Sequence, residues 1–207
     1  MTNSQIKALV ALVFLILVVV LAIQGQAPSK EWLHSFSWVV TGVSLSLLLW
    51  ERWLWSWWGF GFLAKRPDLR GTWRGSILSD WEDPTTKQRR DPVEIYFVIR
   101  QTFSTLDIRL FSPESASQSL SAEIVTDSVG LHTIALTYLN TPDALRLEQS
   151  PISHGGAILG IRGNHLIRQL DGKYWTDRKT VGQMLLTARS SSYCHDFSQA
   201  REKFLGD

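Results

Sequence analysis

The hydrophobic pattern divides the chain into an apolar N-terminal part and a longer part in which apolar and polar residues alternate. Ile6 to Ile23 is a run of 18 residues, mostly Leu, Val and Ile, that only Lys7 interrupts. At 1.5 Å per residue such a helix is long enough to cross the roughly 30 Å hydrocarbon core of a bilayer. A second apolar segment, Trp32 to Trp50, follows a short polar connector that contains Pro28. The pattern predicts two transmembrane helices within residues 1–63.

A cleaved signal peptide and a buried helical hairpin are the alternatives for this region. The first apolar run is unusually long for a signal peptide, and Gly25-Gln26-Ala27 is a poor cleavage site. A buried hairpin would need more chain than residues 64–207 to cover it. The end of the second segment is typical of a lipid–water interface, with an aromatic ligand platform as the other interpretation, because it holds five tryptophans: Trp50, Trp53, Trp55, Trp57 and Trp58.

The basic residues that follow the second segment predict its orientation. Lys65, Arg66 and Arg70 come directly after the tryptophans, whereas the connector between the two segments holds only Lys30 and Glu31. By the positive-inside rule, the short N-terminus and the region after residue 63 both lie in the cytoplasm.

From Leu69 onward the hydrophobic period changes to two, which is typical of half-buried strands. The alternation predicts strands at Trp73–Leu78, Val93–Phe103, Leu106–Leu110, Leu120–Thr126, His132–Asn140, Arg146–Glu148, Ala157–Arg162, His165–Leu170 and Val181–Arg189. Ser112–Ser121 is interpreted as a loop, and Ser198–Phe204 has helical character. About eight short antiparallel strands in residues 64–207 predict a small closed β-barrel, with a sandwich as the alternative.

Composition and motifs argue against several classes of function. The formal net charge is only +2, so no strong field attracts a DNA or RNA polymer. A single cysteine, Cys194, excludes an intrachain disulfide, and its neighbour His195 is not thereby oriented for catalysis. The histidines lack the paired spacing of a zinc site, and no Walker loop occurs. We therefore expect neither an enzyme nor a metal site.

Gly172 to Gly182 is the most unusual stretch of the second part. It is too polar for a core strand and too aromatic for a solvated turn, which predicts a surface on which a ligand docks. Aromatic rings can stack on a base, basic side chains can bind phosphate, and hydroxyls add short contacts: these are Tyr174, Trp175, Thr176, Arg178, Lys179 and Thr180. The alternative places Tyr174 and Trp175 in the core and Asp177-Arg178 in a solvated turn.

Several segments taken together resemble one known family. The segments are Gln101-Thr102, the serine run from Ser115 to Ser119, Tyr138-Leu139-Asn140-Thr141-Pro142, His154-Gly155-Gly156-Ala157 and the stretch from Gly172 to Thr180. In this order, and after two predicted spans, they resemble the two-transmembrane, β-strand-rich effectors of CBASS anti-phage defence. The resemblance covers essentially the whole chain, and the last segment is its most specific part.

The resemblance implies a function and a set of site residues. In that family a cytoplasmic β-barrel recognises a cyclic dinucleotide made by a CD-NTase-type nucleotidyltransferase, binding drives self-association, and the spans disrupt the bacterial inner membrane. No cofactor is implied. The expected ligand-binding residues are Gln101, Ser117, Ser119, Tyr138, His154, Tyr174, Thr176, Arg178 and Thr180.

Three other functions are open from the sequence. A membrane-tethered, lipocalin-like carrier of an apolar small molecule would need an oily cavity. An enzyme that acts through His154 and Asp177 would turn over a nucleotide. A scaffold subunit would bind no ligand.

Overall fold

The computed structural model describes residues 15, 18–19, 30–57, 66–82, 87–89, 91–144, 150–163 and 169–206. The chain divides into two compact units. The first consists of Met1–Arg66 together with Thr102–Thr105, and the second consists of Pro67–Gln101 and Leu106–Asp207.

The N-terminal unit contains one long helix, α2 (Lys30–Arg52), followed by the 3-10 helix η1 (Leu54–Ser56). The prediction of a helix over Trp32–Trp50 is confirmed. No helix among the described residues is long and apolar enough to cross a membrane. In α2, hydroxyl residues and the charged residues at the two helix ends lower the hydropathy. The first predicted span, Ile6–Ile23, lies almost entirely outside the described residues. The structure therefore does not support the prediction of two spans.

The tryptophan cluster has two environments. Trp55 is buried, at 1% exposure, and its ring lies 6.4 Å from the ring of Phe103. Trp53 and Trp57 are 60% and 54% exposed, and Trp58 lies outside the described residues. The cluster is therefore partly a packing element of the N-terminal unit, because η1 turns Trp55 inward.

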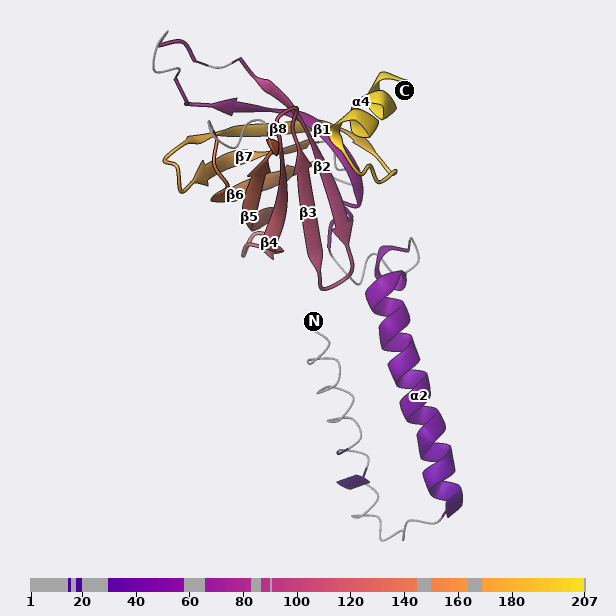
Figure 1. Ribbon diagram of the computed structural model, residues 1–207. Coiled ribbons are helices and arrows are strands. Elements are labelled where there is room, and N and C mark those ends of the chain that lie inside the picture. The colour runs from indigo at the N-terminus through magenta and orange to yellow at the C-terminus, as the bar shows by residue number, and fades with distance from the viewer. Residues whose placement is uncertain are drawn as a thin grey trace. The chain divides into compact units, whose positions relative to one another are not determined.

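The second unit is a closed barrel of eight strands, each antiparallel to the next, with β1 and β8 closing the circle (Figure 1). The strands are β1 (Gly71–Ser79), β2 (Val93–Gln101), β3 (Leu106–Phe111), β4 (Ser115–Thr126), β5 (His132–Pro142), β6 (Ser153–Arg162), β7 (Gln169–Thr176) and β8 (Val181–Ser190). The predicted eight-stranded barrel is confirmed, and the sandwich alternative is wrong.

Alternation along the strands builds two apolar cores, one on each side of the barrel wall. Inward-facing side chains such as Trp73, Phe97 and Leu159 fill the barrel and are at most 1% exposed. On the outside, Tyr96 on β2 packs against Phe197 and Phe204 of the C-terminal helix α4 (Phe197–Leu205). The predicted tail helix is confirmed, and it covers apolar outer positions of β2 that would otherwise be exposed.

Two strand assignments from the sequence require correction. Ser115–Ser119 was expected in a loop but is the first part of β4, because its serines find hydrogen-bond partners inside the sheet. The last strands also shift: the predicted strand His165–Leu170 is replaced by β7, which runs to Thr176. The predicted strand at residues 146–148 lies outside the described residues.

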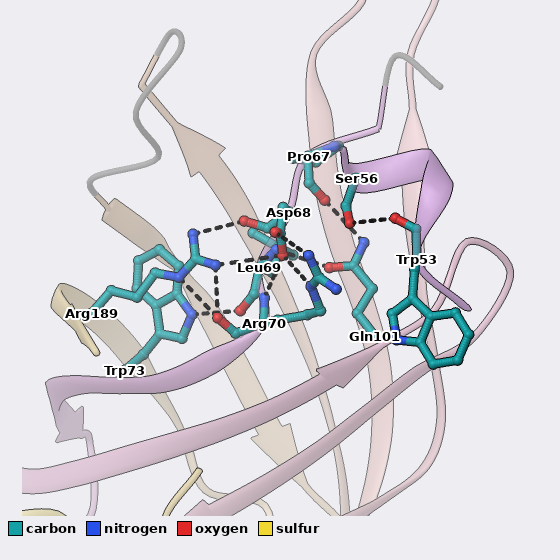
Figure 2. A network of polar contacts seen from close by, with 9 residues as sticks. All are labelled: Trp53, Ser56, Pro67, Asp68, Leu69, Arg70, Trp73, Gln101 and Arg189. Carbon is teal, nitrogen blue, oxygen red and sulfur yellow. Dashed lines mark hydrogen bonds and ion pairs between the residues drawn. The ribbon is translucent and has the colours of Figure 1, made fainter. Parts of the chain in front are cut away.

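The end of the barrel at which β1 begins is closed by a polar network around a buried leucine (Figure 2). Leu69 is fully buried, and its carbonyl accepts a 2.8 Å hydrogen bond from Trp73 Nε1. Arg189 donates to the carbonyls of Asp68 and Arg70 at 2.7–3.0 Å, and its guanidinium lies 5.5 Å from the ring centre of Trp73. Burial would raise the pKa of Asp68, but hydrogen bonds and charge from Arg70 outweigh it and hold that pKa below its usual value.

Candidate functional site

Most of the predicted site residues gather at the opposite end of the barrel, which we call the mouth. In an antiparallel barrel the ends of odd strands and the starts of even strands meet at one rim. The mouth is therefore formed where β5 and β7 end and β4, β6 and β8 begin. It brings together eight of the nine predicted residues: Ser117, Ser119, Tyr138, His154, Tyr174, Thr176, Arg178 and Thr180.

Three of these residues line a small cavity inside the barrel. Ser117, Ser119 and Tyr138 share it with Phe97, Ile108, Leu110, Leu136, Ala157 and Met184. The cavity holds about 10 Å³, which is room for one water molecule. Ser117 Oγ donates to Asn140 Oδ1 at 2.9 Å, and Ser119 Oγ accepts from the Ile108 N–H at 2.9 Å. The serines therefore bring polar atoms into a wall that is otherwise apolar.

Two buried tyrosines project into the barrel near the mouth. Tyr138 and Tyr174 are 8% and 7% exposed, and burial raises the pKa of both phenols, that of Tyr138 well above its usual value. A hydrogen bond with Ser79 partly offsets this effect on the pKa of Tyr174. Among the described residues no hydrogen bond engages the Tyr138 hydroxyl, and the rise in its pKa comes from burial and nearby charge alone. Tyr138 is therefore a neutral donor without a protein acceptor.

Glycines provide the space for these rings. A Cβ on Gly155 would lie 2.5 Å from the Tyr138 hydroxyl oxygen, and a Cβ on Gly182 would lie 2.5 Å from Tyr174 Cε1. Real Cβ atoms do not approach other atoms this closely, so any larger side chain would displace a ring or a neighbouring strand. These glycines therefore make room for the tyrosine rings.

The β7–β8 turn forms one side of the mouth and carries its basic residues. The Thr176 and Thr180 hydroxyl oxygens lie 2.6 Å apart, and the Thr176 N–H donates to the Thr180 carbonyl at 3.0 Å. Lys179 has a φ of 62°, the left-handed conformation that a three-residue hairpin loop requires. Arg178 is exposed, and its guanidinium donates to Ser150 Oγ at 2.7 Å. The turn thus presents two cations, Arg178 and Lys179, next to the mouth.

His154 and Asp177 join the turn to the start of β6. The His154 N–H donates to Asp177 Oδ2 at 2.9 Å, and the His154 Nδ1 lies 3.5 Å from the same oxygen. The hydrogen bonds from His154 hold the pKa of Asp177 below its usual value. Both side chains are at least half exposed, which makes this pair a surface brace.

The interpretation of Gly172–Gly182 as one continuous surface is wrong. Residues up to Thr176 belong to β7, where alternation places Tyr174 inside the barrel and Trp175 outside at 46% exposure. Only the turn that follows is a solvated surface. The alternative from the sequence is therefore correct for Tyr174 and for the turn, and wrong for Trp175.

Gln101 is not brought together with the other predicted residues. It lies at the far end of β2, is 6% exposed, and has both ends of its amide engaged (Figure 2). Gln101 Oε1 accepts from the Leu69 N–H at 2.8 Å, and Nε2 donates to the Pro67 carbonyl at 2.9 Å. These bonds hold the segment Pro67–Leu69, which closes the end of the barrel at which β1 begins.

We expect Gln101→Ala to lower the free energy of unfolding by about 2–3 kcal/mol, because it leaves the buried Leu69 N–H without an acceptor. Denaturant unfolding measures the loss, with Gln118→Ala on the exposed face of β4 as the matched control. The affinity for the expected ligand, a cyclic dinucleotide, should be unchanged at low temperature. A folded Gln101→Ala protein with lost affinity would instead assign Gln101 to the ligand site.

Sequence reasoning missed three polar residues of the mouth. Asn140 accepts from Ser117, Ser153 is 3% exposed and pairs with Asn140, and Ser79 contacts Tyr174. Asn140 lies two residues after Tyr138, so strand alternation alone places it on the same face. No sequence signal marks Ser79, because only the closure of β1 on β8 brings it to Tyr174, and none marks Ser153, which reaches the mouth by pairing with Asn140 of β5.

Metal-ligating side chains do not cluster in the part of the chain that the structure describes: no group of three or more His, Cys, Asp or Glu could hold an ion there. Cys194 is buried in the outer core beside α4, where its N–H donates to Thr72 Oγ1 at 3.2 Å.

Comparison with known proteins adds to this geometry. Residues 64–188, more than half of the chain, match the family described as Cap15, cyclic dinucleotide receptor domain. A Staphylococcus schleiferi protein named CD-NTase-associated protein 15 is 29% identical over 173 residues, which cover 84% of this chain and 87% of that protein. Both findings confirm the resemblance to CBASS effectors that the ordered motifs indicate. The chain therefore belongs to the Cap15 cyclic dinucleotide receptor family.

Proposed function

We propose that this chain is a CBASS effector that binds a cyclic dinucleotide at the mouth of its barrel and responds by self-association and disruption of the inner membrane. The observation that carries the binding step is the Tyr138 hydroxyl, a donor that no described protein group engages, at the same rim of the barrel as the two cations of the β7–β8 turn. Family membership supports the ligand class.

The chemistry of the mouth fits the two parts of such a ligand. Arg178 and Lys179 can neutralise phosphates, and the guanidinium can donate two parallel hydrogen bonds to one phosphate. Ser117, Ser119 and the neutral Tyr138 phenol supply short polar contacts for sugar or base edges. Arg178 already bonds a serine hydroxyl, so a phosphate would replace a neutral acceptor with a charged one.

The size of the cavity limits where the ligand binds. Ligand sites of this kind occupy about 300–1,000 Å³, whereas the cavity holds about 10 Å³. The ligand therefore sits at the mouth, and binding displaces the exposed turn or the tyrosine rings. This cavity is also too small for the apolar cargo of a lipocalin-like carrier, which makes that alternative the weaker one.

The remaining steps of the proposal follow the resemblance. A partner CD-NTase-type nucleotidyltransferase supplies the ligand, and ligand shifts the chain toward an assembled state only if it binds that state more tightly. Residues 1–63 act on the lipid bilayer of the inner membrane, with the barrel on the cytoplasmic side. Catalysis forms no part of the proposal, and the expectation that the chain is not an enzyme stays a prediction.

The direct test is the melting temperature of the full chain in detergent with a panel of cyclic dinucleotides: cyclic di-GMP, cyclic di-AMP, cyclic di-UMP and a mixed purine–pyrimidine member. A binder is stabilised by about 2.7 kcal/mol at a hundredfold excess over Kd. No shift with any member would overturn the receptor step. Release of dye from vesicles that contain the chain, on addition of the active member, tests the membrane step separately.

We expect Arg178→Ala to remove most of the ligand-induced shift while the unliganded melt stays nearly unchanged, because this side chain is exposed and makes one surface hydrogen bond. Arg109→Ala is the matched control, since Arg109 is exposed on the outer face of β3, away from the turn. An equal loss of affinity in both variants would mean that net charge, and not the mouth, attracts the ligand.

A further inference from the structure

The turn between β2 and β3 has an unusual place in the fold. This turn, Thr102–Thr105, which we call the hairpin tip, belongs to the compact N-terminal unit, although both strands that it joins belong to the barrel. The barrel is therefore connected to the N-terminal unit at three points of the chain: after Arg66, after Gln101 and before Leu106. An ordinary linker would provide only the first.

A single carboxylate accepts three hydrogen bonds from the hairpin tip. Glu51 lies in the last turn of α2, and its Oε1 accepts from Thr102 Oγ1 at 2.6 Å and from the Ser104 N–H at 3.1 Å. The Ser104 hydroxyl donates to the same oxygen. Hydrogen bonds to a charged acceptor are stronger than those between neutral groups.

Backbone and ring contacts reinforce this attachment. The Phe103 N–H donates to the Glu51 carbonyl at 3.0 Å, one of the carbonyls that a helix end leaves without an internal partner. The Phe103 ring lies edge-on to Trp50, with ring centres 5.8 Å apart, and also packs against buried Trp55. The tip thus caps the end of α2 by backbone, carboxylate and aromatic contacts.

The hairpin does not need these contacts in order to turn. The Thr102 N–H donates to the Thr105 carbonyl, and the Thr105 N–H donates to Thr102 Oγ1, both at 3.0 Å. These two bonds close the turn within the tip itself. The Thr102 hydroxyl donates to Glu51 while it accepts from Thr105, and the Ser104 donors take no part in closing the turn. The bonds to Glu51 therefore serve the attachment of α2 and not the folding of the hairpin.

We propose that the hairpin tip is a clamp that couples the ligand state of the barrel to α2, with Glu51, Thr102 and Ser104 as its positioning residues. This inference rests on the proposed function. The cavity wall includes Phe97 on β2 and Ile108 on β3, the same two strands that continue into the tip. A ligand that displaces the cavity wall shifts these strands, and the clamp passes the shift into the N-terminal unit through covalent and hydrogen bonds. Coupling of this kind between two sites amounts to about 5- to 150-fold in equilibrium terms.

The test separates binding from response in the full chain. Glu51→Ala removes all three bonds to the carboxylate, and the double variant Thr102→Val with Ser104→Ala removes the two from hydroxyls together with the Thr102 acceptor of the turn. Glu123→Ala, on the exposed outer face of β4, is the matched control. With the panel member that gives wild type its largest melting shift, all variants should keep that shift to within about a fifth. Dye release should fall at least about tenfold in the two clamp variants and stay at the wild-type level in Glu123→Ala.

Hydrogen exchange supplies a readout that does not depend on membrane damage. In wild type, the same cyclic dinucleotide should change amide exchange in residues 49–56, and in the clamp variants it should not. Clamp variants that bind and still release dye or alter exchange like wild type would overturn the inference, and so would variants that lose binding. Wild type that binds and shows the exchange change without dye release would overturn only the membrane step of the proposed function. No binding by wild type would overturn the proposed function, and with it this inference.

Discussion

Replacement of Tyr138 by phenylalanine is expected to weaken cyclic dinucleotide binding about tenfold or more while it leaves the unliganded protein as stable as before. Tyr138→Phe removes only the donor, and a sugar or base acceptor left without its donor in a buried site costs about 1–3 kcal/mol. The hydroxyl has no partner among the described residues, so no protein group loses a bond. Titration of ligand against the melting temperature measures both quantities in one experiment.

Tyr96→Phe is the matched control for this prediction. Tyr96 lies on the other side of the barrel wall, and its hydroxyl donates to Glu94 Oε1 at 2.9 Å. Burial and that carboxylate raise the pKa of Tyr96 to about 12. Tyr96→Phe should therefore cost stability and leave ligand affinity unchanged. The opposite result, full affinity in Tyr138→Phe, would remove the Tyr138 hydroxyl from the ligand site.

The affinity of the unmodified protein also reflects the space that the ligand must create. If the conformation with an open mouth is only a fraction of the population, the observed Kd is the intrinsic Kd divided by that fraction. The packed tyrosines at the mouth therefore reduce affinity, but they also make binding depend on a change in the barrel wall. A preformed, empty pocket would bind the ligand more tightly, but binding would not change the barrel wall.

Gly182→Ala is expected to lower the free energy of unfolding by about 2–3 kcal/mol, a large share of the about 5–15 kcal/mol typical of a domain. The added methyl would lie 2.5 Å from Tyr174 Cε1 and 3.0 Å from the Ser79 Cα, and it would also meet the Leu78 carbonyl oxygen. Two of these three atoms are backbone in β1, so rotation of Tyr174 alone cannot relieve the contact. Denaturant unfolding of the full chain measures the loss.

Gly160→Ala adds the same methyl group at a position where there is room for it. Its nearest neighbour would be the Asp171 carbonyl oxygen at 3.6 Å, an ordinary contact distance. We expect Gly160→Ala to change stability by less than about 1 kcal/mol, because a compatible Gly→Ala replacement also reduces the entropy of the unfolded chain. Equal losses of stability at both positions would show that backbone entropy, and not the fit of Tyr174, determines the cost of replacing a glycine in the barrel.

Strand alternation was sufficient to predict an eight-stranded barrel, and the tail helix followed from helical character at Ser198–Phe204. Local pattern carries this information because the faces of a strand alternate with a period of two. The same reasoning failed at Ser115–Ser119, where a serine run lacks an apolar period. There, pairing with β5 decided the conformation, since Asn140 and other groups of the sheet bond the serine side chains.

The sequence by itself determined the family and the β-barrel, and eight of the nine site residues predicted from it meet at the mouth, because ordered motifs can be identified without knowledge of their contacts. Only the tertiary structure decided what each residue does. The pairing of β1 with β2 places Gln101 beside Leu69 at the far end of the barrel, and the glycines next to Tyr138 and Tyr174 leave space for the two rings. The tertiary structure also attaches the hairpin tip to Glu51, 51 residues before Thr102 in the chain. Such roles depend on contacts between distant segments, which a pattern of neighbouring residues does not contain.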